Sequence, residues 1–413
     1  MGALMCRGRR DALASQTRSL SSTNPTPSSS STAPSPNIFS ATDTSFTGGQ
    51  HTNSSSSQSL SSLASLRSSL PDTPSLYSTA EISAAEINPS AKRLSSSSFR
   101  CLLRGRDVFI HRRRFRGDPE TLPSLLSDAF KSHHRSLVRL LGASVSSDNI
   151  HLVYDFAPGA PLSASLRNPQ NPKFTALSSW ISRMQIATDL AQGLDYIHHH
   201  SGGGGSVHNR IKSSSIIVSE TGFNAKLCHF GAALLAGEIE INKLMKSNSR
   251  SIKIEGTRGY LAPEVIAGGC VTRKSDVFAL GVVLLELISG DEPLTYRLCA
   301  GGEKRYERSS LIETAREVVG AAGWEEEGSP AGFVEKRMER VRHWVDRRLR
   351  DSFPLDVAEK MTMVALRCVE GDAAKRPGMS WVEGKISQLF LESKAWSEKI
   401  RVPVDISATF GPR

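Results

Sequence analysis

The sequence has few of the features that mark disulfide-rich, zinc-binding or membrane-spanning proteins. Its six cysteines are scattered over 413 residues without a C-x-x-C pair, which argues against a disulfide framework or a zinc site and predicts a reducing compartment. No segment reaches the roughly 18–20 apolar residues of a transmembrane helix. The best run, residues 277–288, is too short and contains Glu286. The first residues also show no apolar segment of a signal peptide.

Aromatic residues are scarce, at 6% of the chain, whereas positive charge is in excess, with a formal net charge of +10. Two arginine-rich runs, residues 100–116 and 336–350, hold much of this excess. Such runs contact phosphates, anionic lipid or acidic partners, or they form a solvated face. Aromatic side chains are not interleaved with these charges as in nucleic-acid-binding segments, so we expect no nucleic-acid partner.

Serine dominates the chain from residue 14 to about residue 98, together with Thr, Pro and Asn. This composition cannot bury enough apolar area to offset the loss of chain entropy, so residues 1–74 are predicted to be a disordered tail. The extreme N-terminus, M-G-A-L-M-C-R-G-R-R, offers two lipidation candidates, Gly2 for myristate and Cys6 for palmitate, with nearby arginines as a basic second signal. The alternative is an N-terminus without lipid.

Beyond the tail, the pattern changes from short strands to amphipathic helices. Strand character appears at residues 101–103 and 108–110, with Gly105 at the turn between them, and again at 137–141 and 150–156. A helix is expected near residues 119–131. Apolar residues between 181 and 197 recur at three- and four-residue spacings, which predicts an amphipathic helix. Further helices are expected near residues 275–288, 310–320, 335–350, 355–370 and 380–394.

Three stretches have the order of protein-kinase motifs. Residues 207–218 read V-H-N-R-I-K-S-S-S-I-I-V, residues 226–231 read K-L-C-H-F-G, and residues 256–264 read G-T-R-G-Y-L-A-P-E. In a protein kinase they would be H-R-D-x-K-x-x-N, D-F-G and A-P-E. Further matches are H-H-R-S-L-V-R-L-L-G at 133–142, L-V-Y-D-F-A-P-G-A-P-L at 152–162, K-S-D-V-F-A-L-G-V-V-L-L-E-L-I-S-G at 274–290, W-V-D-R-R-L at 344–349 and K-R-P-G-M at 375–379.

Residues 75–395 therefore resemble the kinase domains of plant receptor-like kinases and receptor-like cytoplasmic kinases, most of all the intracellular region of LysM receptor-like kinases. The resemblance implies an α+β, two-lobed protein-kinase-like fold with a small β-rich N-lobe and a large helical C-lobe. It places the N-lobe at about 95–153, the hinge at 154–158 and the C-lobe at 159–395. Residues 396–413 would be a C-terminal tail, and residues 291–339 a loop-rich insertion.

The same resemblance shows that catalytic residue types are missing. Arg210 stands where the catalytic Asp would be, Ser215 where the metal-binding Asn would be, and His229 where the metal-binding Asp of D-F-G would be. Phosphoryl transfer needs an oriented nucleophile and Mg²⁺ held by oxygen ligands. Arginine cannot act as a base at neutral pH. His229 offers a nitrogen and Ser215 only a hydroxyl in place of the metal ligands, so we expect no metal site. Lys212 matches the lysine that contacts the transferred phosphate in this family, or it is a structural or solvated lysine.

The nucleotide site is altered too. Residues 95–98 are all serine where glycines would cradle the phosphates, and His111 replaces the lysine of the V-A-I-K pattern. The glutamate that would hold this lysine falls near Leu125. Phe109 stands where a small residue would roof the adenine, so its ring either fills the nucleotide slot or turns into the N-lobe core. At the expected hinge, Tyr154 would be the gatekeeper, followed by Asp155 and Phe156.

Structural motif residues of the family persist. His208 and Phe230 match two stacked residues of the regulatory spine, and Asp276 matches the acid that anchors the catalytic-loop backbone. Glu264 and Arg376 match the ion pair that ties the activation segment to the lower lobe, and Gly231 is retained. The scaffold residues are thus kept while the catalytic residues are changed.

The resemblance and the substitutions together favour a receptor-like-kinase-type pseudokinase that acts without catalysis, as a signalling scaffold or allosteric partner of an active receptor kinase at the plasma membrane. No cofactor is expected in this interpretation. Its partners would be a receptor kinase or an active cytoplasmic kinase, and its location cytoplasmic, with attachment to the inner face of the plasma membrane if the N-terminus is lipidated. Two alternatives use ATP, namely a weakly active serine/threonine kinase with Mg²⁺ and a non-catalytic ATP-binding switch.

Overall fold

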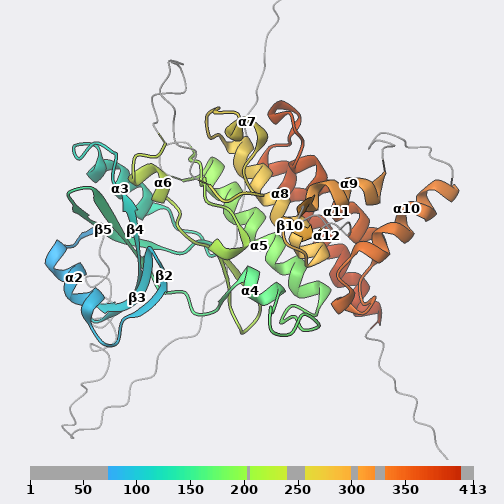
Figure 1. The fold of residues 1–413 in the computed structure, drawn as a ribbon, viewed down its shortest axis with the longest axis horizontal. Helices are drawn as coiled ribbons and strands as arrows, with labels where there is room; N and C mark the ends of the chain where they lie inside the picture. Colours follow the sequence, from blue (N-terminus) through green and yellow to red (C-terminus); the bar gives the residue numbers. More distant parts are fainter. Residues whose placement is uncertain (1–72, 202–204, 240–255, 299–305, 321–330, 401–413) are drawn as a thin grey trace, which may run out of the picture. The chain divides into compact units, whose positions relative to one another are not determined.

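The computed structural model describes residues 73–201, 205–239, 256–298, 306–320 and 331–400 (Figure 1). The predicted serine-rich tail, with the lipidation candidates Gly2 and Cys6, lies outside the described residues apart from its last positions. Among the described residues, no helix combines the length and the apolar composition that a membrane crossing requires.

A six-stranded sheet forms the N-terminal lobe, in the order β1-β5-β6-β4-β3-β2. The expected turn at Gly105 is confirmed, because Arg104 and Gly105 both have positive φ and connect β3 to β4. β1 alone pairs in parallel, with β5, and the other neighbours are antiparallel. The strands are β1 (Ser75–Leu76), β2 (Lys92–Ser95), β3 (Ser98–Leu103), β4 (Arg106–Arg114), β5 (Leu140–Ser146) and β6 (Asn149–Asp155).

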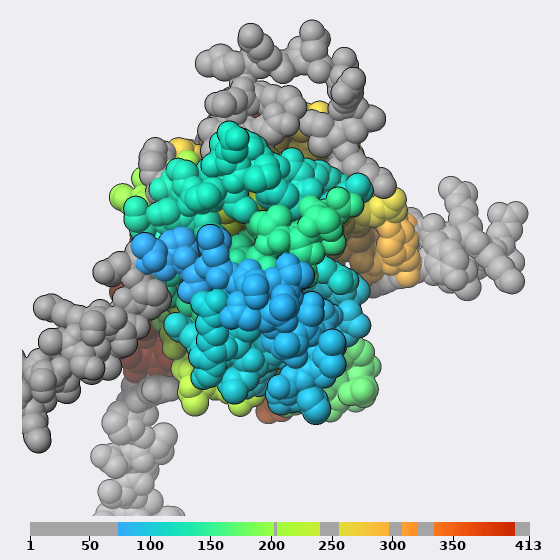
Figure 2. Space-filling view, turned by 90° about the vertical axis from the view of Figure 1, so that its left-hand side faces the viewer, coloured from blue at the N-terminus to red at the C-terminus, as the bar shows by residue number. Residues whose placement is uncertain are grey.

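The two faces of this sheet have different partners. α2 (Thr79–Ile87) begins at a Ser78–Glu81 capping box and covers one face, where Val108 and Ile110 of β4 are buried with Ile82. Figure 2 looks onto this lobe, and the earliest described residues, in blue, lie across its front. Because successive side chains of a strand point to opposite faces, Phe109 lies on the other face, where it packs against the core shared with the C-terminal lobe.

The expected strand at residues 137–141 begins later than predicted. The amide of Val138 donates to the carbonyl of Leu227 at 2.9 Å, and the amide of Leu227 donates to the carbonyl of Ser136 at 2.8 Å. The first residues of the apolar run therefore pair with β9, in the other lobe, and β5 starts only at Leu140. Periodicity alone could not distinguish these two pairings.

The C-terminal lobe is helical, as expected, and is built around α8 (Arg273–Ser289), which is buried over most of its length. A small sheet of β7 (Ala160–Pro161), β8 (Ile216–Val218) and β9 (Ala225–Leu227) lies beside η1 (Ser213–Ser215). The helices are α3 (Leu122–Lys131) in the first lobe, and then α4 (Leu162–Leu166), α5 (Trp180–His199), α6 (Ala232–Leu235), α7 (Pro263–Ile266), α9 (Leu311–Val319), α10 (Ala331–Trp344), α11 (Leu355–Cys368) and α12 (Met379–Ile400).

Two boundaries differ from the sequence analysis. The region expected to be a loop-rich insertion contains an antiparallel hairpin, β10 (Leu294–Leu298) and β11 (Tyr306–Ser310), followed directly by α9. At the other end, α12 continues to Ile400, five residues past the expected end of the C-lobe. Its side chains Leu389 and Ser393 are still buried, and Ser393 accepts a hydrogen bond from Nε1 of Trp180 in α5, which fixes the helix against the lobe.

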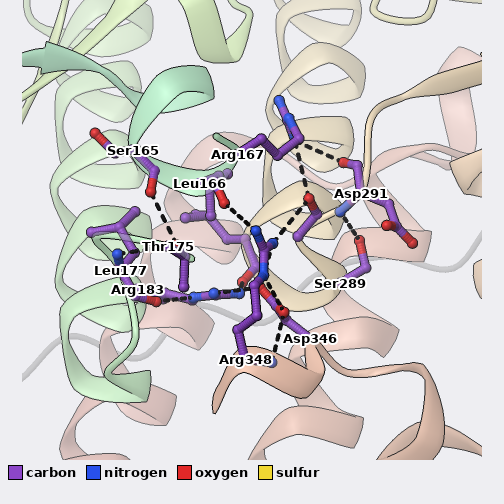
Figure 3. A network of polar contacts seen from close by, with 12 residues as sticks. Ser165, Leu166, Arg167, Thr175, Leu177, Arg183, Ser289, Asp291, Asp346 and Arg348 are labelled. Carbon is purple, nitrogen blue, oxygen red and sulfur yellow. Dashed lines mark hydrogen bonds and ion pairs between the residues drawn. The ribbon is translucent and has the colours of Figure 1, made fainter. Parts of the chain in front are cut away.

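A buried polar network joins the helices of this lobe (Figure 3). Arg183 of α5 is almost completely buried and donates to the carboxylate of Asp346 and to the carbonyls of Leu177 and Leu287. Arg348 contacts the same carboxylate and the carbonyl of Leu166. The carboxylate thus neutralises two arginines inside the lobe and connects α4, α5 and the segment after α10.

Candidate nucleotide and catalytic site

Four rings gather where β4 meets the segment that follows β9. Phe109 and His111 come from β4, Tyr154 from the end of β6, and His229 from the position of the D-F-G aspartate. The ring centroids of His111 and His229 are 4.3 Å apart, those of Phe109 and His229 are 5.5 Å apart, and those of Tyr154 and His229 are 6.2 Å apart. Of the two orientations open to Phe109, the structure has the one that faces His229. We call Phe109, His111, Tyr154 and His229 the ring cluster.

Both imidazoles of the ring cluster favour the neutral form. Burial lowers the pKa of His111 to about 3, and the positive charges of Arg113, Arg210 and Lys212 act in the same direction. Burial also holds the pKa of His229 well below its usual value. Nδ1 of His111 lies 2.8 Å from the hydroxyl of Ser98, one of the serines in place of the glycine-rich loop. Where a kinase has a lysine and an aspartate, this site therefore has two uncharged rings.

The motif arginine is engaged by a carboxylate that the sequence analysis missed. Glu238 lies just after α6 and forms ion pairs with Arg210, in the catalytic-loop position, and with Arg113 of β4. The exposed fractions of these three side chains are 8%, 18% and 17%. We call Arg113, Arg210 and Glu238 the triad. It connects β4 of the N-terminal sheet to the catalytic-loop segment. No motif contains Glu238, so only its position after the altered D-F-G segment could have suggested it.

The remaining catalytic-loop positions make local contacts. Nζ of Lys212 donates to the hydroxyl of Thr257 at 3.0 Å, and burial, together with Arg210 and Arg113, lowers the pKa of Lys212. Ser215 is buried in η1, and its carbonyl accepts from the amide of Cys228 at 3.0 Å. Lys212 and Thr257 line a small cavity of about 50 Å³ beside the catalytic loop.

The donor set does not fit a magnesium site. Mg²⁺ prefers carboxylate and water oxygens in an octahedral arrangement, whereas His229 offers a nitrogen. Glu238, a carboxylate that contacts Arg210, is already paired with two arginines. Within the described ranges, no three His, Cys, Asp or Glu side chains are grouped to hold a metal ion. The glutamate that would hold the phosphate-binding lysine falls in α3, near Leu125. Leu125 itself is half-buried, and the acid on the next turn, Asp128, is exposed.

The hinge residues are tied to the N-terminal sheet. The hydroxyl of Tyr154 is buried and donates to the carbonyl of Phe230 at 2.9 Å. Asp155 pairs with Arg106 at 3.0 Å, and the guanidinium of Arg100 lies 3.8 Å from the ring centroid of Phe156. These contacts connect Asp155 to β4 and Phe156 to β3, and they connect Tyr154 to the segment after β9.

The scaffold positions have the geometry that the resemblance implies. The carboxylate of Asp276 accepts from the backbone amides of His208 and Asn209 at 2.6 and 2.8 Å. Burial lowers the pKa of His208 to about 4, and its ring centroid lies 6.5 Å from that of Phe230. The catalytic-loop backbone is thus anchored to α8 although its catalytic side chains are changed.

A second anchor fixes the end of the activation segment. Arg376 is buried and donates to both carboxylate oxygens of Glu264 in α7, each at 2.7 Å. Gly231 has φ of +79°, and a Cβ there would lie 3.3 Å from the Cβ of Ala129 in α3. Glycine therefore allows the turn into α6 and the close approach of α3.

Comparison with known proteins agrees with this architecture. The model of the protein kinase domain matches residues 126–382, so the match begins inside α3, after the strand that carries Phe109 and His111. The chain is 37% identical over 266 residues to LysM domain receptor-like kinase 3 of Arabidopsis thaliana, covering 64% of this chain and 38% of that protein. It is 29% identical over 304 residues to Protein LYK5 of the same plant, covering 74% of this chain and 41% of that protein.

A third relative, the proline-rich receptor-like protein kinase PERK8 of Arabidopsis thaliana, is 35% identical over 250 residues, or 60% of this chain and 32% of that protein. The chain thus spans less than half the length of these relatives. Among solved structures, the pseudokinase domain of BIR2, an immune regulator of the RLK/Pelle family, superposes with a TM-score of 0.55 at 21% identity, covering 82% of this chain and 97% of that one. The predicted two-lobed fold is therefore confirmed, and the chain belongs to the protein kinase family, with LysM and proline-rich receptor-like kinases among its relatives.

Proposed function

We propose that this chain is a catalytically inactive member of the receptor-like kinase group, which acts as a scaffold or allosteric partner of an active receptor kinase at the plasma membrane. The observation that carries the proposal is the pairing of Arg210 with Glu238. The position that should accept a proton holds a fixed positive charge, and the carboxylate beside it is neutralised by two arginines. Neither group is available to bind a metal or to act as a base.

The ring cluster supports a function that does not use ATP. Phe109 and His111 project from β4 toward His229, into the region where the resemblance places the adenine roof and the phosphate-binding lysine. The triad also links β4 to the catalytic-loop segment through Glu238. A nucleotide normally bridges the two lobes of a kinase; here the rings and the triad would stabilise the closed arrangement instead. We infer a fold that presents a kinase-shaped surface without a bound nucleotide.

The first test is thermal unfolding of the full chain with millimolar ATP, with and without Mg²⁺. A ligand at a hundredfold excess over its Kd stabilises the native state by about 2.7 kcal/mol, so an occluded site predicts no shift. A shift that requires Mg²⁺, accompanied by phosphotransfer, would favour the weak kinase. A shift without Mg²⁺ would favour the ATP-binding switch. Either shift would contradict the proposal.

A pair of variants identifies the cause of the occlusion. Phe109→Ala removes the ring that faces His229, whereas Leu102→Ala removes an exposed side chain on the neighbouring strand β3. If the ring blocks the site, Phe109→Ala gains a response to ATP and Leu102→Ala does not.

Binding to the intracellular region of a LysM receptor-like kinase tests the scaffold role. This binding should survive Lys212→Ala, since the role needs no phosphoryl chemistry.

A further inference from the structure

A cavity of about 600 Å³ lies against the hinge, and no residue of the ring cluster lines it. Its walls come from the segment between α3 and β5, from the hinge, and from β9. We call it the rear pocket. It is lined by Ser132, His133, His134, Arg135, Leu137, Val138, Arg139, Asp155, Phe156, Ala157, Pro158 and Lys226. None of these residues belongs to the ring cluster or the triad, and two of them, Asp155 and Phe156, are hinge positions.

The rear pocket is positively charged. It holds three cations, Arg135, Arg139 and Lys226, against one carboxylate, Asp155, which is already paired with Arg106 at 3.0 Å. Arg135 donates to Gln192 and lies 3.6 Å from Asp189, so its charge is partly matched.

Arg139 is the cation with the least compensation. Its Nε is buried and has no hydrogen-bond partner among the described residues, and its guanidinium lies 5.1 Å from the ring centroid of Phe130. No carboxylate in the described part of the chain forms an ion pair with it. Nζ of Lys226 donates to the carbonyl of Arg135 at 2.9 Å, and no carboxylate among the described residues forms an ion pair with it. An anion in the rear pocket would satisfy both groups.

Burial and the positive charges of the rear pocket lower the pKa values of its two histidines. Burial lowers the pKa of His133, and the charge of Arg139 lowers it further. Burial likewise lowers the pKa of His134, with Arg135 acting in the same direction. Nδ1 of His134 accepts from the amide of Ser136 at 3.1 Å, so Nε2 is the remaining donor of its ring. The ring of His134 thus offers an N–H group to a bound oxyanion.

The serine-rich segment enters the described fold next to this site. The described chain starts at Thr73, and β1 pairs in parallel with β5, Ser75 opposite Gly142 and Leu76 opposite Ala143. Because the pairing is parallel, Thr73 and Pro74, the described residues before Ser75, lie toward the end of β5 that leads back to Arg139, three residues before Gly142. The nearest upstream serines are Ser68 and Ser69. Ser69 precedes Thr73 by four residues, which span up to about 14 Å when extended.

We propose that the rear pocket binds a phosphoserine of this chain's own serine-rich segment, next to Thr73. The modification would come from a separate protein kinase, which transfers the terminal phosphoryl group of ATP to the serine Oγ and releases ADP and a proton. The phosphate dianion then accepts charge-assisted hydrogen bonds from Arg139 and Lys226. Docking would hold the segment against the edge of the N-terminal sheet. Phosphorylation of the tail would thereby alter the surface next to the hinge residues that line the rear pocket.

The test uses the full chain with phosphoserine incorporated at Ser69 and NMR titration of the imidazoles. Nearby negative charge favours imidazolium, so the pKa of His133 and His134 should rise relative to the unmodified chain; the signals are assigned with His133→Gln and His134→Gln. Arg139→Gln combined with Lys226→Gln should abolish the rise. Phosphoserine at Ser178, an exposed position in the C-terminal lobe, adds the same charge elsewhere and should leave both pKa values unchanged.

Other outcomes overturn the proposal. No change on phosphorylation at Ser69 or, in a second chain, at Ser68 would contradict docking of this segment. A rise caused by inorganic phosphate, but by neither phosphorylated chain, would assign the rear pocket to a free anion. If Arg139→Gln with Lys226→Gln unfolds the chain, each single variant is used instead, and a rise that persists in both excludes these cations as the phosphate ligands.

Discussion

The imidazole rings of His111 and His229 lie 4.3 Å apart, centroid to centroid, with their planes tilted by 42°. In the kinase pattern these positions hold a lysine and an aspartate, whose opposite charges handle phosphate and metal. Here burial and the surrounding Arg113, Arg210 and Lys212 lower the pKa of His111, and burial and the ring of His111 lower that of His229. Two rings that favour the neutral form can pack closely, so the altered chemistry also makes a packing interface between β4 and the segment after β9.

This packing makes stability depend on pH. The folded state holds the pKa of His111 near 3, against about 6.5 for an unperturbed imidazole. The unfolded chain therefore binds more protons below pH 6.5, and the free energy of unfolding falls as pH decreases from about 6.5 towards 3. Each such ring contributes about 1.4 kcal/mol per pH unit within this window. Urea unfolding at pH 7, 6 and 5 measures the slope.

Two variants separate the ring cluster from other histidines. His229→Phe keeps a ring at this position and removes its titration, so the loss of stability between pH 7 and pH 5 should become smaller. His343→Gln changes an exposed histidine of α10 and should leave the slope as it is. Because His111 remains and His208 is also buried, with pKa values lowered to about 3 and about 4, some slope persists in His229→Phe. An unchanged slope in that variant would show that His229 is not kept neutral by the fold.

The triad predicts a large cost for losing one carboxylate. Glu238→Gln removes the carboxylate that pairs with both Arg113 and Arg210, whose side chains are more than 80% buried. Breaking a buried pair by removing one partner costs about 3–5 kcal/mol, and the free energy of urea unfolding at pH 7.5 should fall by about 3 kcal/mol. Glu220→Gln, an exposed glutamate on the turn between β8 and β9, should change it by less than about 0.5 kcal/mol.

The triad also allows a double-mutant cycle. If Glu238 acts mainly by neutralising Arg113, then Arg113→Gln combined with Glu238→Gln should cost less than the sum of the two single changes. Additive losses would mean that the two side chains do not interact in solution and that the link between β4 and the catalytic-loop segment is absent.

The Asp346 network should be equally sensitive to losing its carboxylate. Asp346→Asn keeps the size of the side chain but removes the charge that faces Arg183 and Arg348 (Figure 3). Because Arg183 is 1% exposed, we expect a loss of about 3 kcal/mol, measured by urea unfolding. Asp351→Asn is the matched control, since its pair with Arg342 is more than half exposed on both sides and is worth at most about 1 kcal/mol. Similar losses in the two variants would contradict the importance of burial.

The fold was predictable because long, ordered matches, such as the buried helix α8 and the Glu264–Arg376 positions, leave few alternatives to a kinase architecture. The orientation of Phe109 follows from strand alternation once Val108 and Ile110 are assigned to the face under α2. Glu238 was not predictable, because its partners are 125 and 28 residues away in the chain and no motif marks it. The rear pocket was also missed, since its cations come from two segments that are separated in sequence, Arg135 and Arg139 before β5 and Lys226 in β9.

The contact between β1 and β5 gives a final prediction, which concerns the entry of the serine-rich segment. A Cβ on Gly142 would lie 1.8 Å from the carbonyl oxygen of Ser75, so Gly142→Ala must displace β1. β1 is only two residues long, and its loss should expose the amide of Tyr77, which donates to the carbonyl of Ala143 at 3.0 Å. Hydrogen exchange at Tyr77 should accelerate while the amides of α8 stay protected.

The control is Gly384→Ala in α12, where a Cβ meets nothing within 4 Å. This variant should leave hydrogen exchange at Tyr77 unchanged and stabilise the helix by up to about 1 kcal/mol. Unchanged exchange at Tyr77 in Gly142→Ala would mean that β1 does not dock on β5, and the described path of the segment past Arg139 would then be wrong.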